Sequence, residues 1–354
     1  MINRFFHRTG RHLLRGVLLT LPMAAFAAED VSSYLDHPRA QLVRDTLAEQ
    51  GADMARVDQL LQDAVKQPDI LESIARPAER TLTWASYQDI FLQPERVRDA
   101  VAFAQQHQDT LQRAEHTYGV PASVILAIIA VETRFGQHMG NHRVLDALAT
   151  LGFDYPPRAD FFRRQLIALL QLDQLEHIDA SEIKGSYAGA MGYGQFIPTS
   201  YQAYAVDFSG DGVVDKVNNV ADAIGSVANY LAEHRWQPGI PLAARATVDG
   251  ERYSAVLENG VRPHMTLAQA AEHGISPVRC DSPPATPFCF GAVEPDRVAG
   301  LLLEGKHGKE IWLVSQNFYA ITRYNHSPLY AMAVTQLAQF IAAAMDASTP
   351  TERP

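Results

Sequence analysis

The sequence of 354 residues has only two cysteines, three tryptophans and no excess of basic residues. Lys and Arg number 30 against 40 Asp and Glu, so the formal net charge is −10. This charge argues against a nucleic-acid-binding surface as the main function, and an acidic substrate would need a locally basic cleft. No internal repeat or low-complexity tract is present. The apolar fraction of 47% and the charged fraction of 20% are ordinary for a soluble, folded protein.

The first apolar run is too short to span a membrane, and it begins after several arginines. It covers 17–24, is interrupted by Pro22, and leads into the small-x-small pattern Ala25-Phe26-Ala27. A membrane span needs about 20 apolar residues, so a cleaved export signal over 1–27 is favoured over an uncleaved anchor. No cysteine lies near the cleavage point, so lipid attachment there is not available.

The two cysteines, Cys280 and Cys289, lie close together in a proline-rich segment. After export they enter an oxidising compartment, where a short-loop disulfide is the natural interpretation and two free thiols the alternative. With two thiols and no nearby pair of histidines, the segment does not indicate a zinc site.

The chain reads as mainly α, in an α+β arrangement. Apolar spacing predicts helices through 28–115, an N-terminal α-helical domain, and a helix apolar nearly all round at 124–131, which is typical of burial. Further helices are expected at 160–175, 220–234 and 329–345. Prolines and glycines break up the composition from about 237, where short runs at 244–248 and 310–314 predict strands. The expected divisions are 1–27, 28–115, 116–236 (the core), 237–304 (a small β-containing domain), 305–346 (a return to the core) and 347–354 (a tail).

Glu132 is the first candidate for chemistry, because it ends the all-apolar helix. Ile128, Ile129 and Phe135 share its helix face, so its carboxyl is expected to lie against apolar neighbours. Desolvation disfavours the charged carboxylate, which suits a general acid. The alternative is a solvated glutamate at a helix end, paired with Arg134.

Two further segments carry the residue types that line sugar-binding grooves. The stretch 185–196 combines repeated glycines with Ser186, Tyr187, Tyr193, Gln195 and Phe196, and 317–330 gathers aromatics, asparagines and an arginine. Glycines let a backbone approach a ligand closely, and the hydroxyls, amides and rings match the edges and faces of sugars. The alternatives are close packing of segments through Gly and Ala and an ordinary core with buried tyrosines.

The acidic stretch 207–215 resembles the first half of an EF-hand calcium loop. Oxygen-bearing side chains alternate, and Gly212 stands at the sixth position. The twelfth position is Asn218 instead of the expected bidentate Glu, so the loop departs from the standard ending. A solvated acidic turn is the alternative.

Four motifs together closely resemble the lytic murein transglycosylase B family, and they occur in that family's order. They cover 132–136, 145–151, 189–196 and 321–325, within a resemblance that runs from about Tyr34 to Met345. The resemblance implies a lysozyme-like catalytic core flanked by an α-helical domain and a small β-containing domain. It also implies cleavage of the MurNAc–GlcNAc β-1,4 bond of peptidoglycan without water, leaving 1,6-anhydro-muramoyl ends.

The resemblance also assigns roles by position. Glu132 matches the catalytic acid/base, Tyr87 an aromatic at the cleft edge, and Arg158 a basic position, although Pro157 stands where members often have a second arginine. The other cleft positions are Ser186, Gln195, Phe196, Tyr230, Tyr324, Asn325 and Tyr330. A structural calcium would be held by Asp207, Ser209, Asp211, the Val213 carbonyl and Asp222, with no cofactor required for the chemistry.

The sequence therefore predicts a periplasmic enzyme, soluble after cleavage of its signal peptide, that acts on peptidoglycan glycan strands with Glu132 as its sole acid/base. The substrate's N-acetyl group can stabilise the developing cation, as in substrate-assisted glycosidases. Two alternatives are a hydrolytic muramidase and a non-catalytic murein-binding scaffold. No nucleic acid is expected as a partner, and among proteins only cell-wall synthesis proteins are candidates, which the sequence does not identify.

We expect Cys280 and Cys289 to be bonded to each other. The closed loop is short, so its constraint on the unfolded chain is worth about 2–3 kcal/mol. Thiol titration of the unfolded, unreduced protein checks this: it should detect no free sulfhydryl, and two free thiols would refute the pairing.

Overall fold

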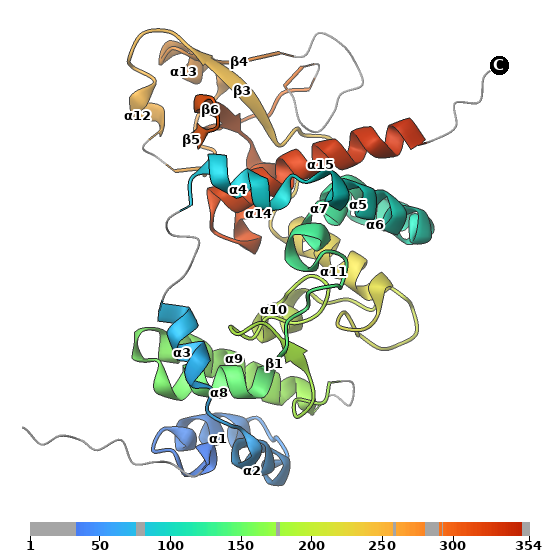
Figure 1. Cartoon of the computed structure of the whole chain (residues 1–354), viewed down its shortest axis with the longest axis vertical. Coiled ribbons are helices and arrows are strands. Elements are labelled where there is room, and N and C mark those ends of the chain that lie inside the picture. Colours follow the sequence, from blue (N-terminus) through green and yellow to red (C-terminus); the bar gives the residue numbers. More distant parts are fainter. Residues whose placement is uncertain are drawn as a thin grey trace, which may run out of the picture. The chain divides into compact units, whose positions relative to one another are not determined.

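The computed structural model describes residues 33–75, 82–174, 178–257, 260–279, 290–291 and 293–348 (Figure 1). The signal segment 1–27, the pair Cys280 and Cys289, and the end of the tail from residue 349 lie outside the described residues.

Helices dominate the described chain, as the sequence predicts. In chain order they are η1 (Tyr34–Asp36), α1 (Ala40–Glu49), α2 (Met54–Asp63), α3 (Pro68–Ala75), α4 (Trp84–Phe91), α5 (Pro94–Gln106), α6 (Gln108–Tyr118), α7 (Ala122–Thr133), α8 (Val144–Asp154), η3 (Pro156–Arg158), α9 (Ala159–Asp173), α10 (Pro198–Tyr204), α11 (Val220–Glu233), α12 (Ser254–Leu257), α13 (Leu267–Glu272), α14 (Gln316–Tyr324) and α15 (Pro328–Ser348).

The largest core surrounds α7. Every residue of this helix from Ala122 to Ala130 is buried, because α5, α6, α11 and α15 pack round it. An apolar stripe on one face would leave the other faces in water, so the all-round apolar pattern of α7 fits only a central position. Glu132, near the end of the helix, is therefore held on a rigid element.

A second core joins distant parts of the chain. Leu47 of α1 and Leu60 of α2 are buried in one cluster with Leu148 of α8 and Leu169 of α9. The segment 84–118, in contrast, packs into the core round α7. The range 28–115, expected to form one N-terminal domain, is thus divided between two cores: α1 to α3 belong with α8 and α9, and α4 to α6 belong with α7.

The β-structure lies where the composition changes. Its antiparallel sheet has the strand order β4-β3-β6-β5, built from β3 (Ala243–Val248), β4 (Ile275–Pro277), β5 (Ala299–Gly305) and β6 (Gly308–Val314). Ala244 and Leu313 are register partners in β3 and β6 and are buried in a small third core. A separate short pair, β1 (His142–Arg143) with β2 (Lys184–Gly185), leads into the glycine-rich stretch.

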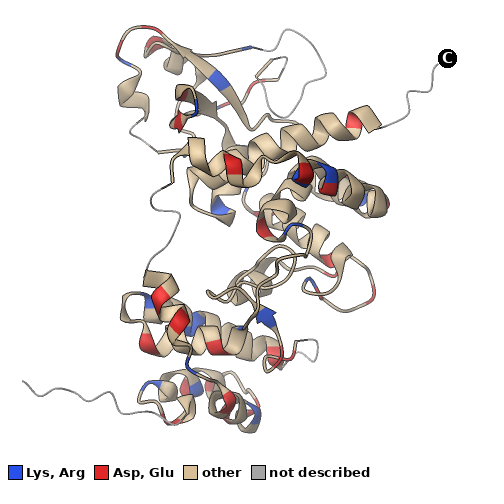
Figure 2. Ribbon diagram, viewed as in Figure 1, with Lys and Arg blue, Asp and Glu red and all other residues tan. Residues whose placement is uncertain are grey.

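Helix α15 is long and apolar enough to cross a membrane by length and composition alone. It carries one charged residue, Asp346 (Figure 2). Its first half is buried against α7, α14 and α5, with Ala331, Val334 and Ala338 fully covered. These contacts identify α15 as a core helix of the folded chain. Its early residues also carry Tyr330 into the region of Glu132.

Candidate active site

Glu132 lies where α7 ends abruptly. Arg134 and Phe135 follow it with φ of 49° and 58°, a left-handed conformation that is strained for residues other than glycine. The N–H of Arg134 donates to the Ala130 carbonyl and that of Phe135 to the Ile129 carbonyl, which closes the helix. The turn directs the chain away just after Thr133, and Glu132 remains partly exposed.

Tyr330 forms a hydrogen bond with Glu132. Its hydroxyl donates to Oε1 of the carboxyl over 2.6 Å. Burial raises the pKa of Tyr330 well above its ordinary value, and the charge of Glu132 raises it further. The phenol therefore stays protonated and acts as a donor. Arg134 forms an ion pair with Asp99 (Nε to Oδ2, 2.7 Å), whereas the alternative interpretation of Glu132 paired it with Arg134.

Three of the expected cleft residues form one aromatic cluster. The ring centroids of Tyr230 and Tyr324 are 4.7 Å apart, and each lies 5.6 Å from that of Phe196. The Tyr230 hydroxyl donates to the Arg323 carbonyl over 2.5 Å, and the Tyr324 hydroxyl donates to the Gly194 carbonyl over 2.5 Å. Burial raises the pKa of Tyr324 well above its ordinary value, and Glu132 adds to that shift.

The glycines of the glycine-rich stretch allow neighbouring segments of the chain to pack closely against it. A Cβ on Gly194 would lie 2.8 Å from the Tyr324 hydroxyl oxygen, and one on Gly192 would lie 2.8 Å from the backbone of Val217. Close approach of neighbouring segments, the alternative to ligand approach, thus accounts for both glycines. Ser186 also shapes this stretch, because its Oγ accepts the N–H of Ala188 and of Ala190.

Gln195 holds the end of the same stretch with φ of 47°. Its Nε2 donates to the carbonyl of Met139 over 3.1 Å and to that of Gly192 over 3.0 Å. The amide therefore joins the segment that follows α7 to the glycine-rich stretch, and its side chain remains partly exposed.

The structure does not bring all expected residues together. Tyr87 is 1% exposed in the α7 core, where its ring packs on that of Phe91 and where it adds to the raised pKa of Tyr330, so its place at the cleft edge stays a prediction. Arg158 is exposed at η3, its guanidinium 4.4 Å from the ring centroid of Phe161. Asn325 follows α14, and its Oδ1 accepts the N–H of Ser327.

Lys216 belongs to this region and was missed in the sequence. It is fully buried, with Nζ 3.5 Å from the ring centroid of Phe196. Burial lowers its pKa well below the ordinary value, and Glu132 opposes that shift. The single hint in the sequence is a lysine between Val214 and Val217 in an acidic loop, and no periodic pattern marks such a residue as buried.

The calcium-like loop has oxygen donors and the required turns, but its carboxylates face its own backbone. Asp222 is buried, and its two oxygens accept the N–H groups of Phe208, Ser209 and Asp215 over 2.7–2.8 Å. Asp207 accepts the N–H of Gly210 and of Gly212, which hold its pKa below the ordinary value.

In the described part of the chain, no three His, Cys, Asp or Glu side chains form a metal-binding group. The expected ligands are therefore not gathered as one cluster. They still fit calcium chemically, because all are oxygens and a carboxylate oxygen that accepts one N–H retains a second lone pair.

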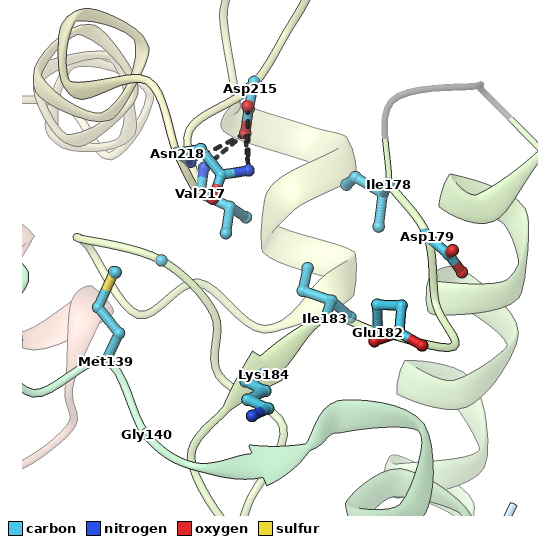
Figure 3. Close-up of a pocket in the computed structure, with 11 residues that line it drawn as sticks. Met139, Gly140, Ile178, Asp179, Glu182, Ile183, Lys184, Asp215, Val217 and Asn218 are labelled. Atoms are coloured by element: carbon cyan, nitrogen blue, oxygen red, sulfur yellow. Dashed lines mark hydrogen bonds between the residues drawn. The ribbon is translucent and has the colours of Figure 1, made fainter.

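A cavity of about 580 Å³ lies beside the glycine-rich stretch, between the residues before β2 and the end of the calcium-like loop (Figure 3). None of its lining residues is an expected site residue. It adjoins the site through Met139 and Gly192, whose carbonyls hold Gln195. Its charged and polar walls include Asp179, Glu182, Lys184, Asp215 and Asn218.

Comparison with known proteins finds relatives over most of the chain. A family model described as "Transglycosylase SLT domain" matches residues 36–339. Membrane-bound lytic murein transglycosylase B of Escherichia coli (strain K12) is 40% identical over 322 residues, 88% of this chain and 84% of that protein.

Solved structures of lytic transglycosylases are also similar to this chain. The soluble lytic transglycosylase SltB1 from Pseudomonas aeruginosa is 42% identical with a TM-score of 0.79, over 87% of this chain and 100% of that chain. The Escherichia coli lytic transglycosylase Slt35 in complex with calcium is 39% identical with a TM-score of 0.76, over 88% of this chain and 95% of that chain.

Replacing Tyr330 by Phe tests the hydrogen bond to Glu132. The ring stays and the donor is lost, so we expect the fold to survive and the release of muropeptides from sacculi to fall about tenfold. Hydrogen bonds to charged groups contribute roughly 1.5–3 kcal/mol, consistent with that loss. Initial rates and melting curves of both proteins provide the measurement. An unchanged rate in Tyr330→Phe would show that this contact does not hold the carboxyl in place.

Proposed function

The chain belongs to the transglycosylase SLT domain family and is a lytic transglycosylase of peptidoglycan. We propose that Glu132 is the single acid/base of this reaction. The observation that carries the proposal is the 2.6 Å hydrogen bond that places this carboxyl beside Tyr330, at the end of a buried helix and next to the aromatic cluster. One carboxyl is enough when the nucleophile belongs to the substrate.

In the first half of the proposed reaction, Glu132 donates its proton to the oxygen that leaves with GlcNAc. The substrate's own N-acetyl group stabilises the positive charge that develops at C1 of MurNAc. The Tyr330 hydroxyl, already donating to Oε1, stabilises the carboxylate that Glu132 becomes.

In the second half, the ionised Glu132 accepts the proton of the C6 hydroxyl, and that oxygen attacks C1. Glu132 is then protonated again and the product carries a 1,6-anhydro ring. No water enters, so the product is lighter by one water than the product of a hydrolytic muramidase.

We propose a division of labour among the expected sugar contacts. Tyr324, Gln195, Asn325 and Ser186 are partly exposed and can touch the glycan. Phe196, Tyr230 and Tyr330 are buried and support those contacts from behind, while buried Tyr87 supports the core. The exposed guanidinium of Arg158 is free to meet an anionic group of the peptide stem.

Glu132→Gln is the central test. Gln keeps nearly the same shape but cannot donate to the glycosidic oxygen or accept from the C6 hydroxyl, so both halves of the reaction lose their catalyst. General acid–base catalysis is worth about 10²–10⁴-fold, and activity on sacculi should fall by at least that factor.

Binding of Glu132→Gln to sacculi and its melting temperature serve as controls, and both should match the wild type. Mass spectrometry of wild-type products should find anhydro ends. Near-normal turnover by a folded Glu132→Gln would overturn the assignment, and reducing ends alone would indicate a hydrolase.

We propose that calcium binds the loop through Asp207, Ser209, Asp211, the Val213 carbonyl and Asp222, and that it stabilises the fold without entering the chemistry. An ion bound only to the native state adds about 2.7 kcal/mol at one hundred times its Kd. The support is the alternating oxygen donors, the left-handed glycines 210 and 212, and the calcium complex of Slt35.

Addition of calcium to chelator-treated protein should therefore raise the melting temperature, and magnesium at the same concentration should raise it less, since it demands near-ideal octahedral geometry. Asp211→Asn is the matched variant, because it removes one charge at an exposed ligand. It should lower the calcium-induced increase. A melting temperature indifferent to calcium and chelator would rule the site out.

We further propose that the protein is exported to the periplasm, cleaved near Ala28 and released in soluble form. The arginine-rich start, the short apolar run and the absence of a cysteine near the cleavage point support this proposal. Membrane fractionation tests it: recovery of the mature protein only in detergent extracts would contradict release.

A further inference from the structure

The chain makes a strained turn directly after the end of α7. Arg134, Phe135 and Gly136 have φ of 49°, 58° and 86°, so three successive residues have positive φ. This conformation costs free energy in arginine and phenylalanine, and it persists only where the surrounding contacts determine it. The turn begins two residues after Glu132. The contacts that hold it therefore also act on the end of the helix that carries this carboxyl.

One face of α5 supplies contacts to this end of α7. Arg96, Asp99 and Phe103 are spaced at i, i+3 and i+7, so their side chains lie along one side of α5. We call these three residues the α5 stripe. Helix α5 packs beside α7 in the largest core (Figure 1).

The two polar residues of the α5 stripe bind the backbone and a side chain of the turn. Arg96 donates through Nη1 to the carbonyl of Ala130, which also accepts the N–H of Arg134. Asp99 accepts from Nε of Arg134 over 2.7 Å, and the two side chains are 31% and 35% exposed. Ion pairs this exposed stabilise a fold only weakly, so loss of this one should leave the fold intact.

Aromatic and backbone contacts hold the rest of the turn. The ring centroids of Phe103 and Phe135 are 4.8 Å apart. In the glycine-rich stretch, the carbonyl of Tyr193 accepts the hydroxyl of Thr133 over 2.9 Å. A Cβ on Gly136 would lie 2.5 Å from the Tyr193 ring, so the two segments are in close contact. The turn is therefore held both by α5 and by the glycine-rich stretch.

We propose that the α5 stripe is a positioning element of the reaction, which holds the strained turn after α7 and so fixes the direction in which Glu132 presents its carboxyl. The proposal rests on the proposed role of Glu132 and deepens it. A single acid/base depends on its geometry, because a displacement of about 1 Å can cost about 10²-fold in rate. The stripe acts through Glu132 and touches no reacting atom.

Asp99→Asn tests the stripe, since Asn keeps the shape and removes the charge that holds Arg134. On uncrosslinked peptidoglycan strands, well below the melting temperature, we expect kcat to fall at least about tenfold and KM to stay within about twofold. The melting temperature should stay near that of the wild type. Glu95→Gln is the matched control, because it removes an exposed ion pair with Arg98 on the same helix, and it should leave kcat unchanged.

Arg134→Gly is the second variant, because glycine adopts positive φ without strain. It loses the ion pair and the strain together, so its melting temperature should equal or exceed that of Asp99→Asn, while its kcat falls by a similar factor. The double variant should lose no more kcat than the more affected single variant, because residues that act as a unit are not additive.

A binding measurement separates positioning from damage to the cleft. Asp99→Asn introduced into Glu132→Gln should bind strands as tightly as Glu132→Gln alone, and weaker binding overturns the proposal. A wild-type kcat in Asp99→Asn or Arg134→Gly also overturns it, as does a raised KM at constant kcat in Arg134→Gly, which would assign Arg134 to the substrate. The proposed acid/base fails separately, through an active Glu132→Gln, so the two failures are distinguishable.

Discussion

The hydrogen bond from Tyr330 to Glu132 is the contact on which the proposed catalytic arrangement depends. It joins residues 198 positions apart, and it forms because α15 packs along α7 in the largest core. Both helices are apolar over nearly all of their buried length, so burial drives their association and brings the donor to the carboxyl. A carboxyl on an isolated helix end would be solvated and free to rotate. Here the tertiary fold brings a hydrogen-bond donor to its Oε1.

Burial imposes a second requirement, since every polar group in the site needs a partner. The hydroxyls of Tyr324 and Tyr230 meet backbone carbonyls of Gly194 and Arg323, and that of Thr133 meets the carbonyl of Tyr193. The glycine at 194 permits one of these approaches, because a Cβ there would collide with the phenol. The glycine-rich stretch therefore serves the site indirectly, through packing that supplies acceptors in the right places.

The loop from Asp207 to Asp222 combines the calcium-like acidic stretch with residues that pack near the aromatic cluster. Its acidic half has the donors of a calcium site, and its last residues reach the interior, where Gly192 packs on the backbone at Val217 and Lys216 lies under Phe196. A loop with the sequence of a surface feature thus packs partly in the interior, and the buried Asp222 accepts backbone N–H groups from its beginning, at Ser209, and from its middle, at Asp215.

The sequence by itself determined the mainly α fold class with a small sheet, the central buried helix and the strand runs 244–248 and 310–314, which lie within β3 and β6. It also determined the family with its activity. Each of these depends on local periodicity or on contiguous motifs. It also pointed to Tyr230 and Tyr324, whose rings lie together, and to Tyr330, which donates to Glu132. Their contacts with sugar and the catalytic role of Glu132 stay predictions. Only the tertiary structure decided that 28–115 is divided between two cores, that Tyr87 is buried and that the loop carboxylates face their own backbone. It alone revealed Lys216. Such facts depend on which distant segments meet, and burial of a polar side chain leaves no periodic trace in the sequence.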